Sequence, residues 1–188
     1  MKTLLESKGY AVSEFDTAQA AADYLDQKID GVSVGIGGSI TVEQMGLYDR
    51  LCRHNTVHWH WKGGDTTAAA VAEVYLSSVN ALSQTGEIVN IDGIGNRVAS
   101  ILYGHKKVYL LVGQNKIAPD FERALSRARN VAAPLNAKRL GKKTPCAVSG
   151  RCHDCNSPER ICKELAVLWG CPMKAEIEII LIHEDLGY

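Results

Sequence analysis

Four cysteines lie close together in the last third of the chain, at Cys146, Cys152, Cys155 and Cys162, with the spacing C-x5-C-x2-C-x6-C. Thiolates are good ligands for soft metals, and a C-x2-C pair lets two sulfurs chelate from a single turn. Both a [4Fe-4S] cluster and a structural zinc use four cysteines. The irregular single-loop spacing favours the iron–sulfur cluster over zinc, whose sites usually show two separated C-x2-C pairs. Reduced thiols or adventitious disulfides, without a metal, are the alternative.

A glycine-rich turn follows an apolar run, with the sequence Gly35-Ile-Gly-Gly-Ser-Ile-Thr. Backbone N–H groups at Gly37 and Gly38 and the hydroxyls of Ser39 and Thr41 can bind a phosphate or carboxylate. The turn lacks the lysine of a phosphate-binding P-loop and the last glycine of a dinucleotide fingerprint. It therefore predicts a site for a small anion, with a plain turn capped by Ser39 as the alternative.

A second polar segment spans residues 80–97 and contains two turns. Arg97 can pair bidentately with an anionic substrate, and Glu87 and Asp92 are candidates for a catalytic base or nucleophile. The amide side chains in the same segment are expected to face the ligand: Asn80, Asn90 and Asn96.

Elements that position these residues alternate between strands and helices. The patterns predict strands over 31–37, 56–61, 78–82, 88–92, 107–112 and 176–182, and helices over 17–28, from Ser39, over 66–76, from Asn96 and over 121–131. This alternation indicates an α/β domain with a mostly parallel sheet flanked by helices, whose ligands bind at the carboxyl ends of the strands. Arg123, Arg127 and Arg129 are expected on a solvated helix face.

The whole chain is expected to form a single domain over residues 1–188, because its length suits one hydrophobic core. Residues 141–172 hold five of the six cysteines and show no strand-like alternation, so we expect a cysteine-rich loop insertion there. The final strand follows this insertion.

Composition excludes several classes of protein. Lysine plus arginine and aspartate plus glutamate both total 21, so the net charge is zero, which argues against a general nucleic-acid binder. No apolar run approaches the ~18 residues of a membrane helix. The N-terminal residues carry no signal-peptide pattern, which predicts a cytoplasmic protein with reduced cysteines.

Two of these motifs, GGSIT and NALSQTGEIVNIDGIGNRVA, together resemble the LUD domain, a family named for lactate-utilisation proteins. The resemblance covers roughly residues 10–185. It implies a fold similar to ribose-5-phosphate isomerase, glucosamine-6-phosphate deaminase and CoA transferases. In those enzymes the glycine-containing loop holds phosphate or CoA, and a later acidic turn carries the catalytic carboxylates. The corresponding residues here are Gly37, Gly38, Ser39 and Thr41 for the loop, and Glu87, Asn90 and Asp92 with Asn96 and Arg97 for the turn.

The resemblance also implies a function. We expect a component of lactate or organic-acid oxidation, with a small anionic ligand, an iron–sulfur centre and electron-transfer partner subunits. Two other functions stay open at this point. One is a non-catalytic assembly subunit with a structural zinc, and the other is an enzyme that processes CoA or sugar phosphates with Glu87 as nucleophile.

Overall fold

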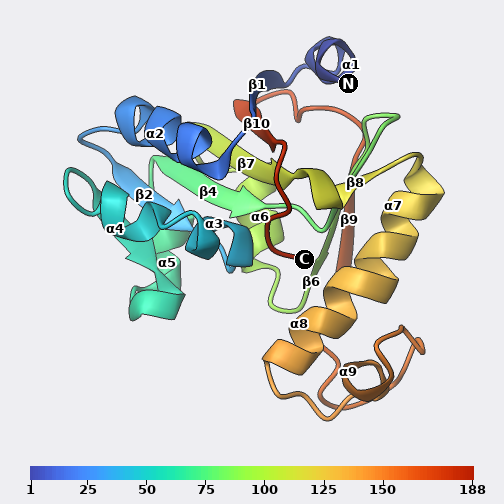
Figure 1. Cartoon of the computed structure of the whole chain (residues 1–188). Helices are drawn as coiled ribbons and strands as arrows, with labels where there is room; N and C mark the ends of the chain where they lie inside the picture. Colours follow the sequence, from blue (N-terminus) through green and yellow to red (C-terminus); the bar gives the residue numbers. More distant parts are fainter.

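A six-stranded sheet forms the centre of the computed structural model, which describes residues 1–188. Every neighbouring pair of strands in this sheet is parallel. The strands in spatial order are β1 (Ala11–Phe15), β10 (Ile177–Ile182), β7 (Lys107–Gly113), β4 (Val74–Ser78), β2 (Ser33–Ile36) and β3 (Thr56–Trp59) (Figure 1). The inner strands β7 and β10 are nearly continuous apolar runs, as expected where helices cover both faces of a sheet.

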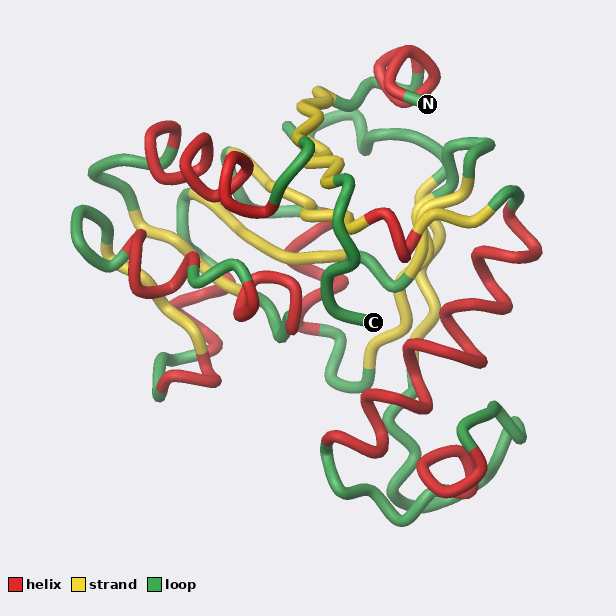
Figure 2. The backbone as a smooth tube through the Cα atoms, viewed as in Figure 1, coloured by secondary structure: helices red, strands yellow, loops and turns green.

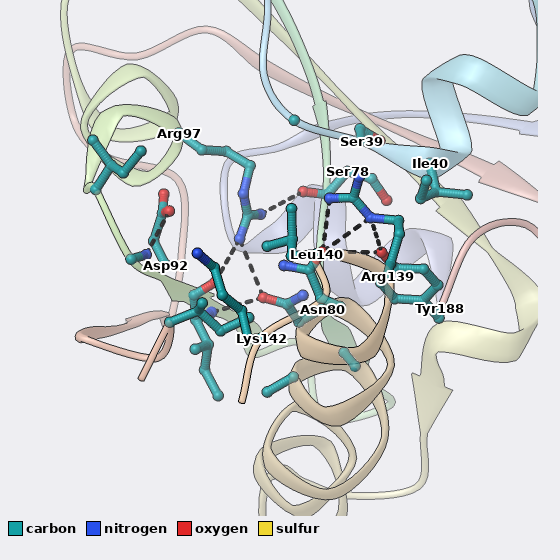
Figure 3. Close-up of a pocket in the computed structure, with 18 of the residues that line it drawn as sticks. Ser39, Ile40, Ser78, Asn80, Asp92, Arg97, Arg139, Leu140, Lys142 and Tyr188 are labelled. Atoms are coloured by element: carbon teal, nitrogen blue, oxygen red, sulfur yellow. Dashed lines mark hydrogen bonds between the residues drawn. The ribbon is translucent and has the colours of Figure 1, made fainter. Parts of the chain in front are cut away.

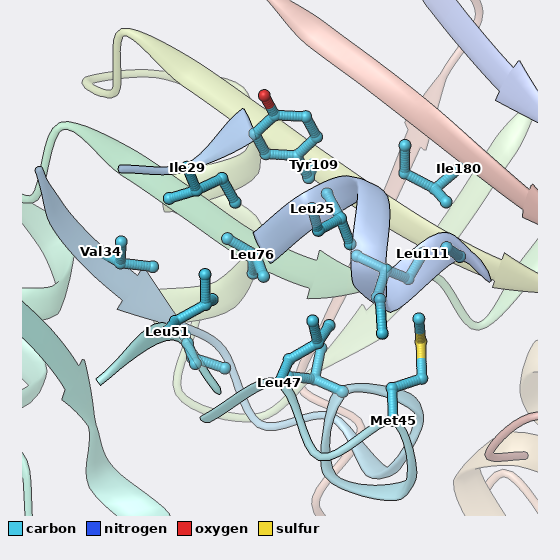
Figure 4. Packing of buried hydrophobic residues seen from close by; sticks show 14 of the residues in the cluster. Leu25, Ile29, Val34, Met45, Leu47, Leu51, Leu76, Tyr109, Leu111 and Ile180 are labelled. Atoms are coloured by element: carbon cyan, nitrogen blue, oxygen red, sulfur yellow. The ribbon is translucent and has the colours of Figure 1, made fainter. Parts of the chain in front are cut away.

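Helices cover the two faces of this sheet. One face carries α2 (Ala18–Lys28), α3 (Ile40–Gln44) and α4 (Leu47–Leu51), and the other carries α1 (Lys2–Ser7), α5 (Thr66–Ala70) and α6 (Asn96–Leu102). Figure 4 shows the first interface, where Leu25 and Leu47 pack against Leu76 and Leu111 of the sheet. These side chains are fully buried, so this layer holds the strand ends rigidly in place.

A smaller sheet lies beside the main one in the order β8 (Ile117–Ala118), β5 (Ala81–Ser83), β6 (Ile88–Asp92) and β9 (Glu164–Leu168). One long helical segment crosses it, built from α7 (Phe121–Arg127), the π-helical turn η3 (Ala128–Ala132) and α8 (Ala133–Arg139) (Figure 2). Ala124 and Ala128 pack on Ala81 and Val89 of the small sheet. Pro134 cannot donate a backbone hydrogen bond, and the π-helical turn ends two residues before it.

Several predicted elements are confirmed. The helix expected over 17–28 begins after Thr17, whose hydroxyl accepts a hydrogen bond from Ala20 N at 3.2 Å. The strands predicted at 88–92, 107–112 and 176–182 correspond to β6, β7 and β10, and α6 begins at Asn96 as expected. None of the helices is long and apolar enough to cross a lipid bilayer.

Other boundaries differ from the predictions. The helix expected over 66–76 ends at Ala70, because the residues from Val74 join the main sheet as β4. The strand expected at 78–82 is split between the end of β4 and the start of β5. In the cysteine-rich segment, the structure forms helix α9 (Pro145–Ser149) and strand β9, where only a loop was expected. β9 forms because it pairs with β6, a partner distant in sequence.

The prediction that Arg123, Arg127 and Arg129 share a solvated face is only partly right. Arg123 is exposed, but Arg127 and Arg129 are half-buried. Arg127 Nε donates to the carbonyl of Asn115 at 2.7 Å, and Nη1 donates to the carbonyl of Asn80 at 2.6 Å. This side chain therefore connects α7 to the turns that follow β4 and β7.

Two short 3₁₀ turns follow strands of the main sheet: η1 (His60–Lys62) comes after β3, and η2 (Gln114–Lys116) comes after β7.

Candidate functional site

A cavity of about 580 Å³ lies where the carboxyl ends of the main-sheet strands meet α8 and the segment around Pro158–Ile161. The turns after β2, β4 and β7 supply Ser39, Asn80 and Lys116 to its wall (Figure 3 labels the first two). The turn after β3 adds Trp61. Because parallel strands end at the same edge, residues distant in sequence meet here, which is the usual ligand site of such sheets.

Lys116 lies in this wall and is only 3% exposed. Its Nζ donates to the Thr41 hydroxyl and to the Ser78 hydroxyl, each at 2.8 Å. Those hydroxyls donate in turn to main-chain carbonyls, Thr41 to Leu186 at 3.2 Å and Ser78 to Leu111 at 2.5 Å. An ammonium group has three N–H donors, so one N–H of Lys116 is left for a ligand.

The charge of Lys116 has no partner within the protein. No carboxylate lies within ion-pair distance of Nζ. Burial, with smaller contributions from the positive charges of Arg127 and Arg97, lowers the pKa of Lys116 to about 7. The amine is therefore poised to gain or lose a proton near neutral pH.

Arg97 lies beside Lys116 and is held by uncharged groups alone. Nη1 donates to the Ser78 carbonyl at 3.1 Å, and Nη2 donates to Asn80 Oδ1 at 3.2 Å (Figure 3). Nη1 also donates to Asn90 Oδ1 at 2.7 Å, and Nη2 to the Ile91 carbonyl at 2.7 Å. All four terminal N–H groups are thereby used. Burial lowers the pKa of Arg97, but a guanidinium stays charged. Arg97 thus gives the cavity a positive charge, not the two free donors that bidentate binding needs.

The glycine turn contributes to the cavity in two layers. Gly38 and Ser39 line it, while Thr41 lies behind them and orients Lys116. Ser39 Oγ accepts from Val42 N at 3.2 Å and so caps α3. A side chain at Gly37 would lie 2.7 Å from the Tyr75 hydroxyl, so this position requires glycine. Because α3 has only five residues, the attraction for anions comes chiefly from the side-chain cations.

The two predicted carboxylates lie at opposite ends of β6. Asp92 lines the cavity together with Asn96, and its oxygens accept from Gly93 N at 2.8 Å and Val98 N at 3.1 Å. Asp92 therefore caps the turn into α6.

Glu87 lies outside the cavity, at the start of the strand. Burial opposes ionisation of Glu87, but hydrogen bonds from Ser83 and Thr85 lower its pKa overall. Its other neighbour is Lys8, 3.6 Å away.

The cavity rim carries three more cations. Arg139 stacks on Trp61, with its guanidinium carbon 4.6 Å from the ring centroid, and its Nε donates to the Tyr188 hydroxyl at 2.7 Å. Lys142 forms no ion pair, whereas Arg160 contacts Asp154 at 3.2 Å. Of the charged side chains that line the cavity, five are basic and two are acidic: Arg97, Lys116, Arg139, Lys142 and Arg160 against Asp92 and Glu159.

The four cysteines of the predicted metal site all lie partly exposed in and after α9. Cys152 Sγ accepts from Asp154 N at 3.3 Å and from Arg129 Nη2 at 3.8 Å, while Cys146 contacts the Thr144 hydroxyl at 3.3 Å. No three metal-ligating side chains are grouped closely enough to hold an ion. Cys146, Cys152, Cys155 and Cys162 are not gathered around one point in this arrangement, and the metal site stays a prediction. The segment nevertheless borders the cavity through Pro158–Ile161.

Comparison with known proteins agrees with this architecture. A family model of the LUD domain matches residues 1–182. The crystal structure of a DUF162 family protein from Deinococcus radiodurans is similar, with a TM-score of 0.54 and 14% sequence identity over 96% of this chain and 92% of that chain. That likeness shows the α/β fold alone. No curated protein is significantly similar in sequence.

The chain belongs to the LUD-domain family, whose name comes from lactate utilisation. The resemblance inferred from the two motifs is thus confirmed.

Sequence reasoning missed Lys116, Arg139 and Lys142. Lys116 ends the short turn η2, which follows the strongly apolar strand β7. The rule that ligands bind at the carboxyl ends of parallel strands could have identified it. Nothing local marks the other two, because the sequence does not show where the end of α8 packs.

Proposed function

We propose that this LUD domain binds a small organic anion, bearing a carboxylate or a phosphate, in the cavity beside Lys116. Support comes from the buried ammonium of Lys116, which has no acidic partner and lies beside the similarly unpaired Arg97. A buried charge is costly unless a counter-charge is close. A bound anion supplies that counter-charge.

The surroundings of Lys116 suit a hydroxy or oxo acid. Its remaining N–H can bind a carboxylate, and the wall next to it offers the Ser39 hydroxyl and the Asn80 side chain for a second polar group. Ile40 and Ile91 supply apolar contacts for carbon atoms. The volume falls within the usual range for small-molecule sites, and a lactate-like acid fits with room to spare. We therefore assign the domain to the handling of lactate or a related organic acid.

The metal centre is a separate proposal. The spacing of Cys146, Cys152, Cys155 and Cys162 supports it, and Arg129 and Arg160 lie close enough to offset thiolate charge. An iron–sulfur cluster, or zinc as the alternative, would require these sulfurs to move together. Electron-transfer partner subunits belong to this proposal and depend on it.

Calorimetric titration with L-lactate, pyruvate and inorganic phosphate tests anion binding, with lactamide as the uncharged control. We expect at least one anion to bind and Lys116→Met to weaken it by about tenfold or more, because a charge-assisted hydrogen bond and a counter-charge are lost. Lys138→Met removes an exposed lysine outside the cavity and should leave binding unchanged. Absence of binding by all three anions, or equal binding to wild type and Lys116→Met, would refute the proposal.

A further inference from the structure

The two hydrogen bonds of Lys116 leave one position on Nζ free at the cavity wall. In the neutral amine that position holds a lone pair instead of an N–H. We propose that Lys116 forms a Schiff base with the carbonyl carbon of a 2-oxo acid bound in the cavity. This inference rests on the proposed anion site, and adds to it a covalent step and a class of substrate.

The geometry keeps the lone pair available. The hydroxyl hydrogens of Thr41 and Ser78 are directed to the carbonyls of Leu186 and Leu111. Both hydroxyls can therefore only accept from Lys116, at 2.8 Å in each case. Neither can donate to the amine and mask its lone pair. Thr41 and Ser78 act as positioning residues that direct the nucleophile toward the bound ligand.

Electrostatics favour the same chemistry. A lysine becomes nucleophilic near neutral pH when it is desolvated or lies beside another cation. Lys116 meets both conditions, because it is buried and has the charges of Arg97 and Arg127 nearby. A substantial fraction of neutral amine is thus present at physiological pH.

The positive charge of the protonated imine indicates which carbonyl compounds can be substrates. The amine attacks the carbonyl carbon, a C–N bond forms, and the carbonyl oxygen leaves as water with the two amine hydrogens. The imine that results becomes cationic when it takes up a proton. Beside Arg97, that cation requires a nearby negative charge, and the carboxylate of a 2-oxo acid lies on the adjacent carbon. A simple aldehyde or ketone has no such group and would be disfavoured.

Trapping with sodium cyanoborohydride tests the proposal on the full chain, with pyruvate and 2-oxobutyrate as probes. The reductant converts an imine to a stable secondary amine, which intact mass and peptide mapping locate. We expect one adduct per chain, at Lys116, formed faster as the pH rises through about 7. Lys138→Met should retain the adduct, and Lys116→Met should lose it.

Two further measurements distinguish failure of the Schiff base from failure of the anion site. Inorganic phosphate should compete with pyruvate for the site and so lower the yield of the Lys116 adduct in wild-type protein. This measurement does not depend on the folding of a variant. Lys116→Arg keeps the positive charge but cannot form an imine, so it should bind pyruvate without becoming labelled. Calorimetric binding of pyruvate without an adduct, or labelling spread over exposed lysines, would overturn the Schiff base and leave the anion site intact. Failure of L-lactate, pyruvate and phosphate alike to bind would instead overturn the proposed function.

Discussion

Lys116 and Arg97 both donate hydrogen bonds to Ser78, one to its side chain and the other to its main chain. Lys116 Nζ donates to the Ser78 hydroxyl at 2.8 Å, and Arg97 Nη1 donates to the Ser78 carbonyl at 3.1 Å. Ser78 is the last residue of β4, so the central sheet itself holds two positive groups side by side. No carboxylate forms an ion pair with either group, so their mutual repulsion is a cost that an anionic ligand would relieve.

Replacing Ser78 with alanine should weaken anion binding about fivefold, the value of one hydrogen bond of about 1 kcal/mol. The hydroxyl stabilises the charged form of Lys116, so its loss should also lower the pKa of Lys116 further. Ser77→Ala is the matched control, because its buried hydroxyl donates only to the main chain, at 3.3 Å. Calorimetry on both variants measures the difference, and equal losses would contradict the role assigned to Ser78.

Stability should depend on pH through Lys116. Its pKa is about 7 in the folded protein against an ordinary value of 10.5. Between these pH values the unfolded chain binds one more proton, so stability rises with pH there. Below about pH 7 both states are protonated and the cost of burying the charge is fully present.

The comparison that isolates this effect is wild type against Lys116→Met. The variant should be more stable at pH 6, and its advantage in the folding equilibrium constant should shrink by up to about tenfold per pH unit above pH 7. Urea unfolding across this range measures it. A difference independent of pH would show that Lys116 titrates at its ordinary pKa.

Arg139 at the cavity rim should contribute less to anion affinity than the buried Lys116. Arg139→Gln removes the cation stacked on Trp61, and we expect a loss of anion affinity of only a few-fold, because exposed charges are screened by water and salt. Raising the salt concentration should abolish this loss while the larger effect of Lys116→Met persists. Arg123→Gln, an exposed arginine on α7, is the control. An Arg139 effect equal to that of Lys116 would place the anion at the rim.

Metal analysis tests the cysteine segment independently. Protein purified without oxygen should contain iron and sulfide and absorb broadly near about 400 nm if a cluster forms. Cys155→Ser should remove that absorbance, and Cys52→Ser, which changes an exposed cysteine outside the segment, should not. A colourless protein with one zinc would support the structural alternative, and a metal-free protein would end both proposals.

Local signals explain why much of the fold was predictable. Thr17 marks the start of α2, and the apolar runs of β7 and β10 identify buried strands without any knowledge of their neighbours. β9 was missed because its residues become a strand only by pairing with β6.

The site was predictable where polar residues lie at the end of a strand or in the turn after it, as Asp92, Ser39 and Asn80 do. Lys116 was missed because a lysine after a strand resembles any surface lysine. Its hydroxyl partners, Thr41 and Ser78, lie 75 and 38 positions away in sequence, and only the folded sheet brings them together. Glu87 lies just before the first residue of β6 and Asp92 is its last residue, so only Asp92 reaches the cavity.

An NMR pH titration of the Lys116 side chain, with Lys116→Met used to assign the signal, measures whether this buried amine lacks a counter-charge and responds to anions. In the free protein we expect a Lys116 pKa of about 7. Addition of L-lactate, pyruvate or phosphate should raise it for at least one of them, because a bound anion stabilises the ammonium form. A pKa near the ordinary lysine value, or one that none of the three anions moves, would contradict an anion site built around an unpaired buried lysine.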